Sequence, residues 1–328
     1  MKNYHAILVS YTNKKHKTSF IEKTFRDLKK NEILVKIKFS CINYKDALSV
    51  TGKTKIIRGS HLTPGLDFSG IVIESNSIKF SKGDRVLATG SGLGESIDGS
   101  FSEYIYVPEE ILLKIPDNLS LLSSMQIGTA GFTSAIAIEK MLLNKQSPND
   151  GPIVISGATG GVGSLSINIL NKLGYKVIAI TRKKKSTAYL KNIGASEIIK
   201  FDSKSNNKPL NSKIFAGAID NVGGRILDWI IKSTSDNGNI VSVGMAQSEK
   251  LETTVIPLII RGVNVLGVTS TNFPNKKRYY IWKKLSNIYK PTKLNKINSS
   301  IIELKDVVKI SRKIINGKST GRIIIKIS

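Results

Sequence analysis

Residues Ile153–Gly163 read IVISGATGGVG, and this stretch decides the fold class of the 328-residue chain. An apolar, strand-like run comes first, a loop of the form G-x-x-G-x-x-G follows, and Ser164–Leu173 has the pattern of a helix. Such a loop lets the backbone approach a pyrophosphate, whose charge is stabilised by amides at the N-terminus of the helix. A glycine turn with a purely structural role is the alternative. The residues expected to bind a dinucleotide in this loop are Thr159, Gly160, Gly161 and Val162.

The chain after Pro152 alternates between short apolar runs and segments of helical length, which is the pattern of βαβ units. Because each run is followed by enough residues for a crossover helix, we expect a doubly wound parallel sheet. The six runs are Ile153–Ile155, Val177–Ile180, Ile198–Ile199, Ala218–Ile219, Ile240–Val243 and Val263–Val268.

Three residues at the end of the second expected strand bear on which dinucleotide binds. An NAD-binding protein places an acidic residue about 20 residues after the loop, where it binds the ribose hydroxyls. This chain has Thr181, Arg182 and Lys183 there. A cation ~4 Å from a phosphate gains ~4 kcal/mol at an effective dielectric of ~20, before desolvation and screening. We therefore expect NADPH in preference to NADH; a solvated helix start is the alternative.

The first third of the chain has a strand pattern. From Tyr4 to about Pro116, short alternating runs are separated by Gly, Pro and Asp turns, so an all-β unit is expected. The pattern becomes helical over Ser120–Leu143, and a terminal strand is predicted at Arg322–Ile327. The expected α/β chain has a β-rich catalytic domain at 1–125, a nucleotide-binding domain at 126–274 and a return to the first domain at 275–328.

Lys and Arg number 50 against 24 Asp and Glu, which gives a formal net charge of +26. A nucleic-acid-binding protein that keeps a nucleotide fold is one interpretation of this charge. The lysines are scattered through every segment, so we expect most of the charge on solvated surfaces and no specific nucleic-acid partner. Part of the charge is expected to attract strongly anionic ligands, such as a dinucleotide.

The single cysteine, Cys41, excludes an intrachain disulfide and a zinc site built from several thiolates. It lies in a strand-like run, so a buried structural thiol is expected and a reactive thiol is the alternative. No run approaches the roughly 18 apolar residues of a membrane span. The N-terminus lacks the apolar core and cleavage site of a signal peptide, so a cytoplasmic protein is expected.

The β-rich front, the glycine loop and the helical segment Ile127–Gly131 make the whole chain resemble the medium-chain dehydrogenases/reductases. Shorter segments make it similar to the acrylyl-CoA reductase branch of the quinone-oxidoreductase group. The resemblance implies a GroES-like catalytic domain joined to a Rossmann domain, with NADPH as cofactor. The segments that narrow the resemblance are Asn43–Leu48, Thr51–Lys53, Lys55–Arg58, Pro64–Gly70, Thr89–Glu95, Tyr189–Leu190 and Thr253–Pro257.

Two pairs of residues bear on zinc. Zinc alcohol dehydrogenases of the same superfamily carry Cys-His where this chain has Asn43-Tyr44, and His-Glu where it has Leu66-Asp67. The resemblance therefore implies a zinc-independent enzyme with no metal site. Alcohol oxidation needs a Lewis acid for the alkoxide, whereas hydride addition to an electron-poor C=C bond needs only hydrogen-bond donors at the carbonyl.

Position in the resemblance implies catalytic roles for three residues. Tyr44 is expected beside the nicotinamide, where its hydroxyl donates to the substrate carbonyl or supports the ring; a buried tyrosine bonded to backbone is the alternative. Asn43 is expected as a neutral donor, and Asp67 as its orienter or as part of a proton path. The alternative for Asp67 is that it ties down the turn after Pro64-Gly65.

Two further sets of residues are implied around these three. Lys53 and Arg58 are expected to meet coenzyme A phosphates or the carboxylate of a small acid, with solvated surface charge as the alternative. The positions that the resemblance alone implies for the cofactor are Met245, Ile259, Ser270 and Arg322.

The function that follows is NADPH-dependent reduction of acryloyl-CoA to propanoyl-CoA. An NADPH quinone oxidoreductase is the alternative of the same class. The loop Ser96–Ser100 departs from the family pattern, so the resemblance implies less about the residues that line the acyl pocket. Family habit and the apolar edge run Val263–Val268 predict a homodimer joined at the sheet edges.

Overall fold

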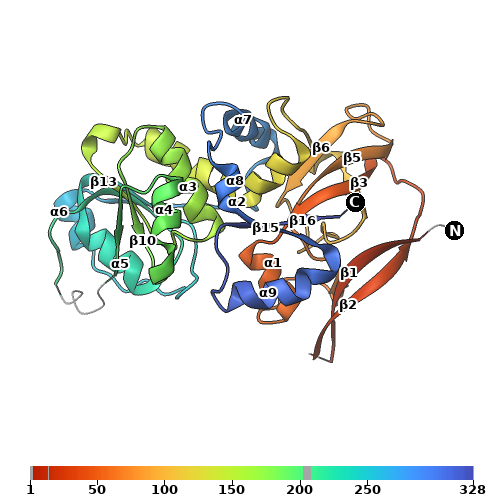
Figure 1. The fold of residues 1–328 in the computed structure, drawn as a ribbon, viewed down its shortest axis with the longest axis horizontal. Coiled ribbons are helices and arrows are strands. Elements are labelled where there is room, and N and C mark those ends of the chain that lie inside the picture. Colours follow the sequence, from red (N-terminus) through yellow and green to blue (C-terminus); the bar gives the residue numbers. More distant parts are fainter. Residues whose placement is uncertain (1–2, 14, 202–207, 328) are drawn as a thin grey trace. The chain divides into compact units, whose positions relative to one another are not determined.

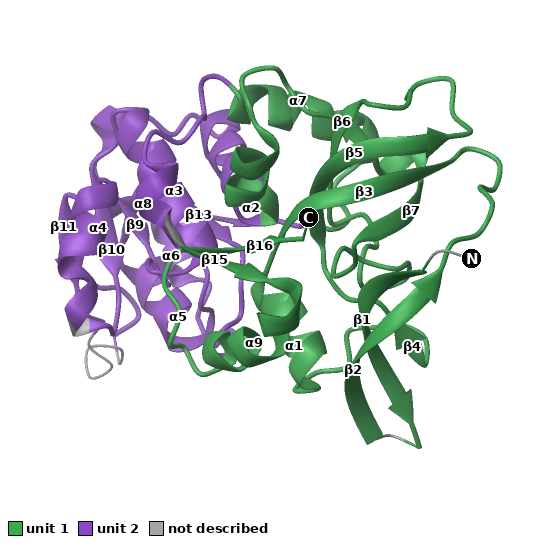
Figure 2. Ribbon diagram, turned by 45° about the vertical axis from the view of Figure 1, so that its right-hand side comes forward, with its two compact units in different colours: residues 1–129, 270–286, 298–328 green, residues 130–269, 287–297 purple. Residues whose placement is uncertain are grey.

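The computed structural model describes residues 3–13, 15–201 and 208–327. The chain forms two compact units, which are drawn in different colours in Figure 2. Unit 1 comprises residues 1–129, 270–286 and 298–328, and unit 2 comprises residues 130–269 and 287–297. The α/β fold class is confirmed, whereas the domain bounds 1–125, 126–274 and 275–328 stay a prediction. The units differ from those bounds most at residues 287–297, a segment that returns to unit 2.

Within the described residues, unit 1 contains a seven-stranded and a three-stranded sheet (Figure 1). The larger sheet has the order β15-β16-β3-β5-β6-β8, with β7 also paired to β3, and the smaller has the order β2-β1-β4. Only β15 and β16 pair in parallel among these described strands. The strands are β1 (Asn3–Thr12), β2 (Lys15–Thr24), β3 (Glu32–Cys41), β4 (His61–Leu62), β5 (Asp67–Ser75), β6 (Arg85–Thr89), β7 (Tyr104–Pro108), β8 (Leu113–Lys114), β15 (Asn298–Glu303) and β16 (Arg322–Lys326).

The alternation of residues along β3 explains its place in the core of the larger sheet. Ile33, Val35 and Ile37 point to one face and are fully buried, whereas Lys36, between them, is half-buried. The buried side chains pack with residues of β5 and β6, among them Phe68. This core therefore fixes the C-terminal end of β3 and the N-terminal end of β5. Polar residues described below lie at those two ends.

The prediction of an all-β front unit is wrong at α1 (Tyr44–Thr51). The N-cap residue Asn43 is extended, and its backbone N–H donates to the Asp46 carboxylate at 2.8 Å. The helix ends at Gly52, whose φ of 68° lies in the left-handed region. An eight-residue helix between strands is too short for helical periodicity to stand out in the sequence.

Other helices of unit 1 come from the last quarter of the chain. The helix α9 (Val307–Ile315) packs against α1, and Val307 shares an apolar core with Ala47 and Val50. The remaining elements are α7 (Asn275–Leu285) and the 3₁₀ turns η1 (Glu109–Ile111) and η5 (Leu304–Asp306).

The described part of unit 2 contains a six-stranded sheet of order β11-β10-β9-β12-β13-β14, and its paired strands all run parallel. Each of the six predicted apolar runs contributes to one strand, so the doubly wound parallel sheet is confirmed. The strands are β9 (Ile153–Ile155), β10 (Val177–Ile180), β11 (Glu197–Ile199), β12 (Phe215–Asp220), β13 (Thr234–Ser242) and β14 (Asn264–Gly267). The helical elements are α3 (Gly161–Lys172), α4 (Thr187–Ile193), α5 (Gly224–Ser233), α6 (Ile256–Arg261), α8 (Leu294–Ile297), η2 (Pro148–Asp150) and η3 (Lys184–Ser186).

The helix α2 (Leu121–Leu143) carries the chain from unit 1 into unit 2. Among the described helices it alone is long and apolar enough to cross a membrane by length and composition. Buried positions make up 78% of its most apolar window, as in the core helix of a globular protein. Gly128 interrupts the helix with a φ of 50° and a ψ of −159°.

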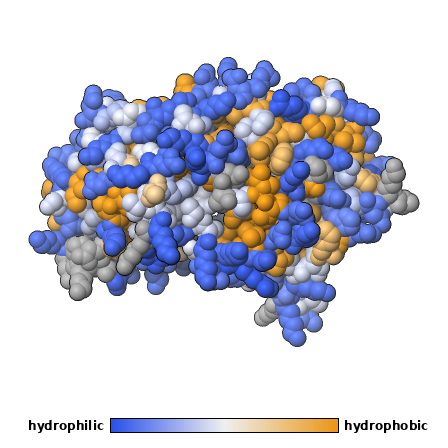
Figure 3. All heavy atoms as spheres, in the orientation of Figure 1, coloured by the Kyte–Doolittle hydropathy of each residue, from blue (hydrophilic) through white to orange (hydrophobic). Residues whose placement is uncertain are grey.

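Hydrophilic residues cover most of the face of the molecule drawn in Figure 3, with separate hydrophobic areas between them. The lysines and arginines lie on elements of both units, which is the scattered arrangement expected from the sequence. Among the described lysines and arginines, only Lys232, Arg278 and Arg322 are buried, so most of the positive charge there is in contact with solvent.

Candidate functional site

The glycine loop of unit 2 joins β9 to α3 and leaves the amides at the start of the helix accessible. Gly157 has a φ of 56°, a conformation that favours glycine. A Cβ on Gly163 would come within 2.6 Å of the Gly157 carbonyl oxygen, so only glycine lets the helix approach the loop this closely. The N-cap of α3 is Gly160, and no described side chain caps the helix. The loop therefore fits the pyrophosphate of a dinucleotide.

A buried carboxylate ties this loop to the neighbouring strand β12. Asp220 accepts hydrogen bonds from the Ser156 hydroxyl at 2.5 Å and from the Gly223 backbone N–H at 2.8 Å. The side-chain amide of Asn221 donates back to the Ser156 carbonyl at 2.8 Å. Burial raises the pKa of Asp220, although the hydrogen bonds that it accepts oppose the change. The start of the predicted dinucleotide loop is thus held by the sheet itself.

The residues predicted to select NADPH follow β10, which runs parallel to β9, so both strands end at the same edge of the sheet. Thr181 accepts a hydrogen bond from the Lys183 backbone N–H at 3.1 Å, which forms a short turn. Arg182 is exposed, and Lys183 is half-buried, so that desolvation lowers its pKa. The structure therefore places both cations on the same sheet edge as the glycine loop.

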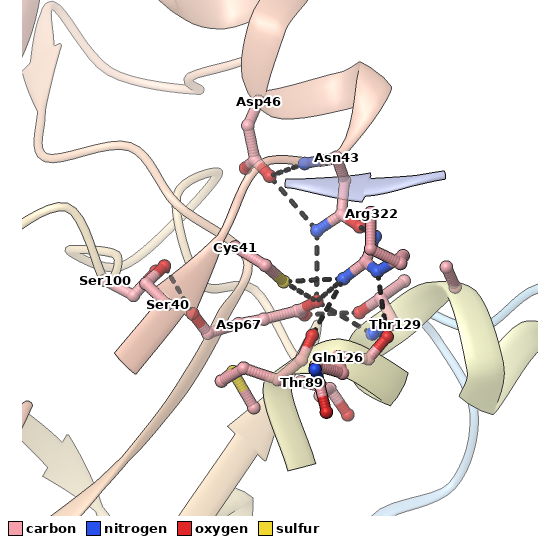
Figure 4. A network of polar contacts seen from close by, with 12 residues as sticks. Ser40, Cys41, Asn43, Asp46, Asp67, Thr89, Ser100, Gln126, Thr129 and Arg322 are labelled. Atoms are coloured by element: carbon pink, nitrogen blue, oxygen red, sulfur yellow. Dashed lines mark hydrogen bonds and ion pairs between the residues drawn. The ribbon is translucent and has the colours of Figure 1, made fainter. Parts of the chain in front are cut away.

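In unit 1, the carboxylate of Asp67 lies at the centre of a polar network (Figure 4). The residue is fully buried, and Oδ2 accepts hydrogen bonds from the Thr129 backbone N–H at 2.7 Å, Asn43 Nδ2 at 3.0 Å and the Cys41 thiol at 3.1 Å. The other oxygen, Oδ1, accepts from the Thr129 hydroxyl at 2.5 Å. The structure thus brings the predicted residues Asn43 and Asp67 together, and it confirms that Cys41 is buried.

Arg322 supplies the cation of this network and is 3% exposed. Its guanidinium donates to Asn43 Oδ1 at 3.0 Å, to the Cys41 sulfur at 2.7 Å and to two main-chain carbonyls of α2, each at 3.2 Å. Nη2 lies 4.0 Å from Asp67 Oδ2. A contact of Arg322 with a dinucleotide stays a prediction; within unit 1 the residue holds Asn43, Cys41 and α2.

A second carboxylate, that of Asp46, lies on the other side of Asn43 and is 3% exposed. Its Oδ2 accepts hydrogen bonds from the Asn43 backbone N–H at 2.8 Å and from Asn43 Nδ2 at 3.1 Å. Desolvation and the Asp67 charge raise the pKa of Asp46 from 3.8 to about 7, against the effect of those bonds. Desolvation also raises the pKa of the Cys41 thiol, although Arg322 opposes it.

Gly128 makes this packing possible. A Cβ built on it would lie 2.5 Å from Arg322 Nη2 and 2.7 Å from Asp67 Oδ2, closer than any side chain can approach. Its positive φ also interrupts α2 just before Thr129, whose backbone N–H and hydroxyl both bind Asp67. Any other residue at this position would displace the central ion pair.

Tyr44 is the first residue of α1 and directly follows Asn43. It is 45% exposed, which excludes the alternative of a buried tyrosine bonded to backbone. Its hydroxyl has no hydrogen bond to the described part of the chain. Tyr44 therefore combines a fixed backbone with a hydroxyl that is accessible to a ligand.

Both units match known families. The family described as "Alcohol dehydrogenase GroES-like domain" matches residues 29–117, and that described as "Zinc-binding dehydrogenase" matches residues 161–287. The probable acrylyl-CoA reductase AcuI of Escherichia coli is 36% identical over 301 residues, which are 92% of this chain and 93% of AcuI. The chain belongs to the medium-chain dehydrogenases/reductases.

Two further relatives support this assignment. The putative quinone oxidoreductase YhfP of Bacillus subtilis is 37% identical over 303 residues, 92% of each chain, and its crystal structure with NAD bound gives a TM-score of 0.93 over 99% of this chain and 100% of that one. The yhdH oxidoreductase of Salmonella enterica in complex with NADP gives a TM-score of 0.94 at 35% identity, over 99% and 100% of the two chains. The predicted GroES-like and Rossmann folds are therefore confirmed for this dehydrogenase/reductase.

The predicted substrate-binding cations of this dehydrogenase/reductase lie on the segment after α1. Lys53 is exposed, whereas Arg58 Nη2 lies 3.3 Å from Glu95 Oε1 and its backbone N–H donates to the Glu95 carbonyl at 2.8 Å. Lys45 forms a second ion pair with the same carboxylate. Desolvation raises the pKa of Glu95, but the two cations outweigh it and the pKa is lowered. The Glu95 carboxylate thus faces two cations, Lys45 and Arg58, so the three side chains together keep a net positive charge.

The remaining residues that the resemblance implied for the cofactor lie in both units. Met245 follows β13 and is 69% exposed, and Ile259, on α6, is 73% exposed. Ser270 belongs to unit 1, where its carbonyl accepts a hydrogen bond from Arg278 at 2.7 Å. Their contacts with a dinucleotide stay predictions.

The positions that hold zinc in other members of the superfamily have different partners in this dehydrogenase/reductase. Asn43 and Asp67 bind each other, Tyr44 is exposed and Leu66 is buried. The described residues contain no group of three or more His, Cys, Asp or Glu side chains that could hold a metal ion. A zinc-independent reaction stays a prediction.

Sequence reasoning missed two buried charges. Asp46 follows Asn43 by three residues, a spacing typical of a capping box, so a signal was available. Arg278, 2% exposed, donates to the Thr89 carbonyl at 2.7 Å across 189 residues of sequence, and no local pattern predicts such a contact. Desolvation lowers the pKa of Arg278 to about 10, against the attraction of Asp67.

Proposed function

We propose that the protein reduces the C=C bond of acryloyl-CoA to give propanoyl-CoA, with NADPH as the reductant and without zinc. The observation that carries the proposal is the 36% identity to AcuI, named a probable acrylyl-CoA reductase, over 92% of this chain. The exposed hydroxyl of Tyr44 supports it, because this reaction needs a hydrogen-bond donor at a carbonyl and no Lewis acid.

When bound, NADPH supplies the hydride that the β-carbon of the thioester accepts. Tyr44 then does the work of the protein at the carbonyl. Its hydroxyl donates to the thioester oxygen, where negative charge develops as the enolate forms, and a solvent proton reaches the α-carbon. Asp67, which the resemblance implied as a catalytic residue together with Asn43, accepts a hydrogen bond from Asn43 Nδ2 at 3.0 Å and so holds the residue that directly precedes Tyr44.

The coenzyme A part of the substrate gives the protein a handle that a free acid lacks. Lys53 is exposed, and Arg58 is held by a single side-chain contact with Glu95, so both side chains can meet phosphate oxygens. Binding energy gained there would position a small acyl group that offers few contacts of its own.

Acryloyl-CoA is expected to be used at least tenfold better than crotonyl-CoA, free acrylate or a benzoquinone. Free acrylate lacks the coenzyme A handle, which lowers the cost of positioning the substrate, and a quinone lacks both the handle and the thioester. A pocket that fits a three-carbon acyl group disfavours the extra methyl group of crotonyl-CoA. Steady-state rates followed by NADPH absorbance give kcat/KM for all four compounds. A tenfold higher kcat/KM for the quinone would overturn the proposal. A higher kcat/KM for crotonyl-CoA would keep enoyl thioesters as the substrate class and would indicate a larger acyl pocket near Ser96–Ser100.

A quinone oxidoreductase is the second candidate, favoured by the 37% identity to YhfP, named a putative quinone oxidoreductase. An exposed tyrosine hydroxyl also suits a quinone carbonyl. Product analysis separates the candidates, since one NADPH converts the thioester to propanoyl-CoA but converts a quinone to a hydroquinone.

We propose NADPH in preference to NADH, although YhfP has been crystallised with NAD. Replacement of Arg182 and Lys183 together by Ala is expected to raise the KM for NADPH about tenfold or more, because two cations beside the adenosine phosphate are lost. The KM for NADH should stay nearly unchanged. The matched control is Arg312→Ala with Lys313→Ala, which removes the same charges from exposed positions of α9. Equal effects on both dinucleotides would show that Arg182 and Lys183 act nonspecifically.

We further propose a cytoplasmic homodimer joined at the β14 edge of unit 2. β14 ends the six-stranded sheet among the described strands, and α6, which precedes it in the chain, exposes Ile260. An uncovered strand edge with exposed apolar side chains favours pairing with a second copy. Light scattering at micromolar concentration is expected to give about twice the chain mass of 35.9 kDa. The mass of a single chain would contradict this.

A further inference from the structure

The hydrogens on the Asn43 side chain decide whether that residue can donate to a substrate. A side-chain amide carries two N–H groups. Asn43 Nδ2 lies 3.0 Å from Asp67 Oδ2 and 3.1 Å from Asp46 Oδ2, so each hydrogen has a carboxylate acceptor. Neither hydrogen is left for a substrate oxygen.

The orientation of the Asn43 amide follows from the charges around it. Its oxygen accepts from Arg322 Nη1 at 3.0 Å, whereas its nitrogen faces the two carboxylates (Figure 4). With oxygen and nitrogen exchanged, the oxygen would face Asp46 and Asp67, and the NH₂ group would face the guanidinium. Because the contacts of the exchanged amide with Asp67 and with the guanidinium would both be repulsive, only one orientation fits the network.

We propose that Asn43 is a positioning residue held by Asp46, Asp67 and Arg322, and that Tyr44 is the side-chain donor to the substrate carbonyl. This inference rests on the proposed function and deepens it. It changes the role that the resemblance implied for Asn43, from neutral donor to support for Tyr44.

The backbone around Asn43 explains how the network reaches Tyr44. The Asn43 N–H donates to Asp46 at 2.8 Å, and its carbonyl accepts from the Ala47 N–H at 3.1 Å, the first helical bond of α1. The preceding residue, Ile42, donates to the Ile323 carbonyl of β16 at 3.1 Å. The backbone on both sides of Asn43 is therefore fixed, up to the carbonyl that leads into Tyr44, while the Tyr44 side chain remains 45% exposed.

Asp46 is the member of this network that no sequence pattern assigned to function. It is buried, and its Oδ2 accepts from both the backbone and the side chain of Asn43, so it sets two of the contacts that orient that residue. From β5 and β16 the charged groups Asp67 and Arg322 face the same amide. On α9, which also packs against α1, the charged side chains of Lys309, Arg312 and Lys313 are exposed.

A double-mutant cycle tests whether Asn43 acts through Tyr44. In the wild-type background, Asn43→Ala and Asp46→Asn are each expected to lower kcat by roughly tenfold to a hundredfold, because small misplacements of a donor cost this much. In a Tyr44→Phe background, neither is expected to lower kcat further. The KM for NADPH should stay within about twofold, since these residues do not contact the dinucleotide in the proposal.

Asn43→Ala that lowers kcat by the same factor in both backgrounds would overturn the inference, because an independent donor does not need Tyr44. If Asn43→Ala does not fold, as judged by circular dichroism, Asp46→Asn carries the cycle, since it keeps the size of the side chain. The matched control is Asp27→Asn, an exposed carboxylate of unit 1, which is expected to leave kcat unchanged in both backgrounds.

Failure of the proposed substrate can be distinguished from failure of the positioning role. The cycle uses acryloyl-CoA; if the wild-type protein reduces a benzoquinone and not acryloyl-CoA, the proposed substrate fails and the cycle is measured with the quinone. With whichever substrate the protein reduces, independent effects of Asn43→Ala and Tyr44→Phe on kcat would contradict the positioning role and not the proposed function.

Discussion

With Phe in place of Tyr44, kcat for acryloyl-CoA is expected to fall by about 10²- to 10³-fold, the usual effect of removing one donor from a developing oxyanion. The ring and its packing stay, so the dissociation constant of NADPH should change by less than about twofold. Steady-state assays give kcat, and fluorescence titration gives the affinity for NADPH. The effect is large because Tyr44 is the exposed donor at a position whose neighbour, Asn43, already uses both amide hydrogens.

Tyr279→Phe is the matched control for this prediction. Tyr279 is 52% exposed on α7 in the same unit, so it loses a hydroxyl of similar accessibility at a place with no proposed role. A kcat for Tyr44→Phe within threefold of the wild-type value would show that the carbonyl receives its donor from elsewhere, such as the backbone.

Replacement of Arg322 by Ala is expected to lower the free energy of unfolding of unit 1 by about 3–5 kcal/mol, as found when one partner of a buried ion pair is removed. The loss leaves Asp67 buried without its nearest cation, and it also leaves Asn43 Oδ1 without a donor. Denaturant unfolding followed by fluorescence measures the effect. Trp282 is fully buried in unit 1 and Trp229 lies in unit 2, so single-tryptophan variants separate the two units.

Arg312→Ala removes an exposed arginine from α9 and is expected to change the unfolding free energy by less than about 0.5 kcal/mol. Asp67→Asn combined with Arg322→Met should recover part of the loss, because the unpaired charge disappears with its partner. An Arg322→Ala protein as stable as the wild type would mean that the network can rearrange without its cation.

Local patterns in the sequence predict most of unit 2. The strand, glycine loop and helix of Ile153–Leu173 follow one another within about twenty residues, and a Cβ at Gly163 would clash, as expected of a loop that packs closely on its helix. The apolar runs also predict the six strands, although β13 begins at Thr234, well before the apolar run at Ile240. Strand ends depend on pairing with neighbours, which a single sequence does not display.

The candidate site of unit 1 could be predicted in most of its members, Asp46 excepted, but not in its contacts. The resemblance pointed to Asn43, Tyr44 and Asp67, and the structure places the first and last of these 3.0 Å apart, Nδ2 to Oδ2. The contact between Arg322 and Asn43 spans 279 residues of sequence and depends on the pairing of β16 with β3. Whether a side chain still has a free donor or acceptor can be established only from the tertiary structure, because it depends on which partners are already bonded.

Cys41 gives the network a property that can be followed without turnover. It is the only thiol of the chain, it is fully buried, and its sulfur contacts both Arg322 and Asp67. A labelling reagent can reach it only after β3, β16 and α2 separate locally, so the rate of alkylation reports the free energy of that opening when reclosing is faster than alkylation. Alkylation of Cys41 can thus be used on the intact enzyme to measure local opening at the place where its ion pair is buried.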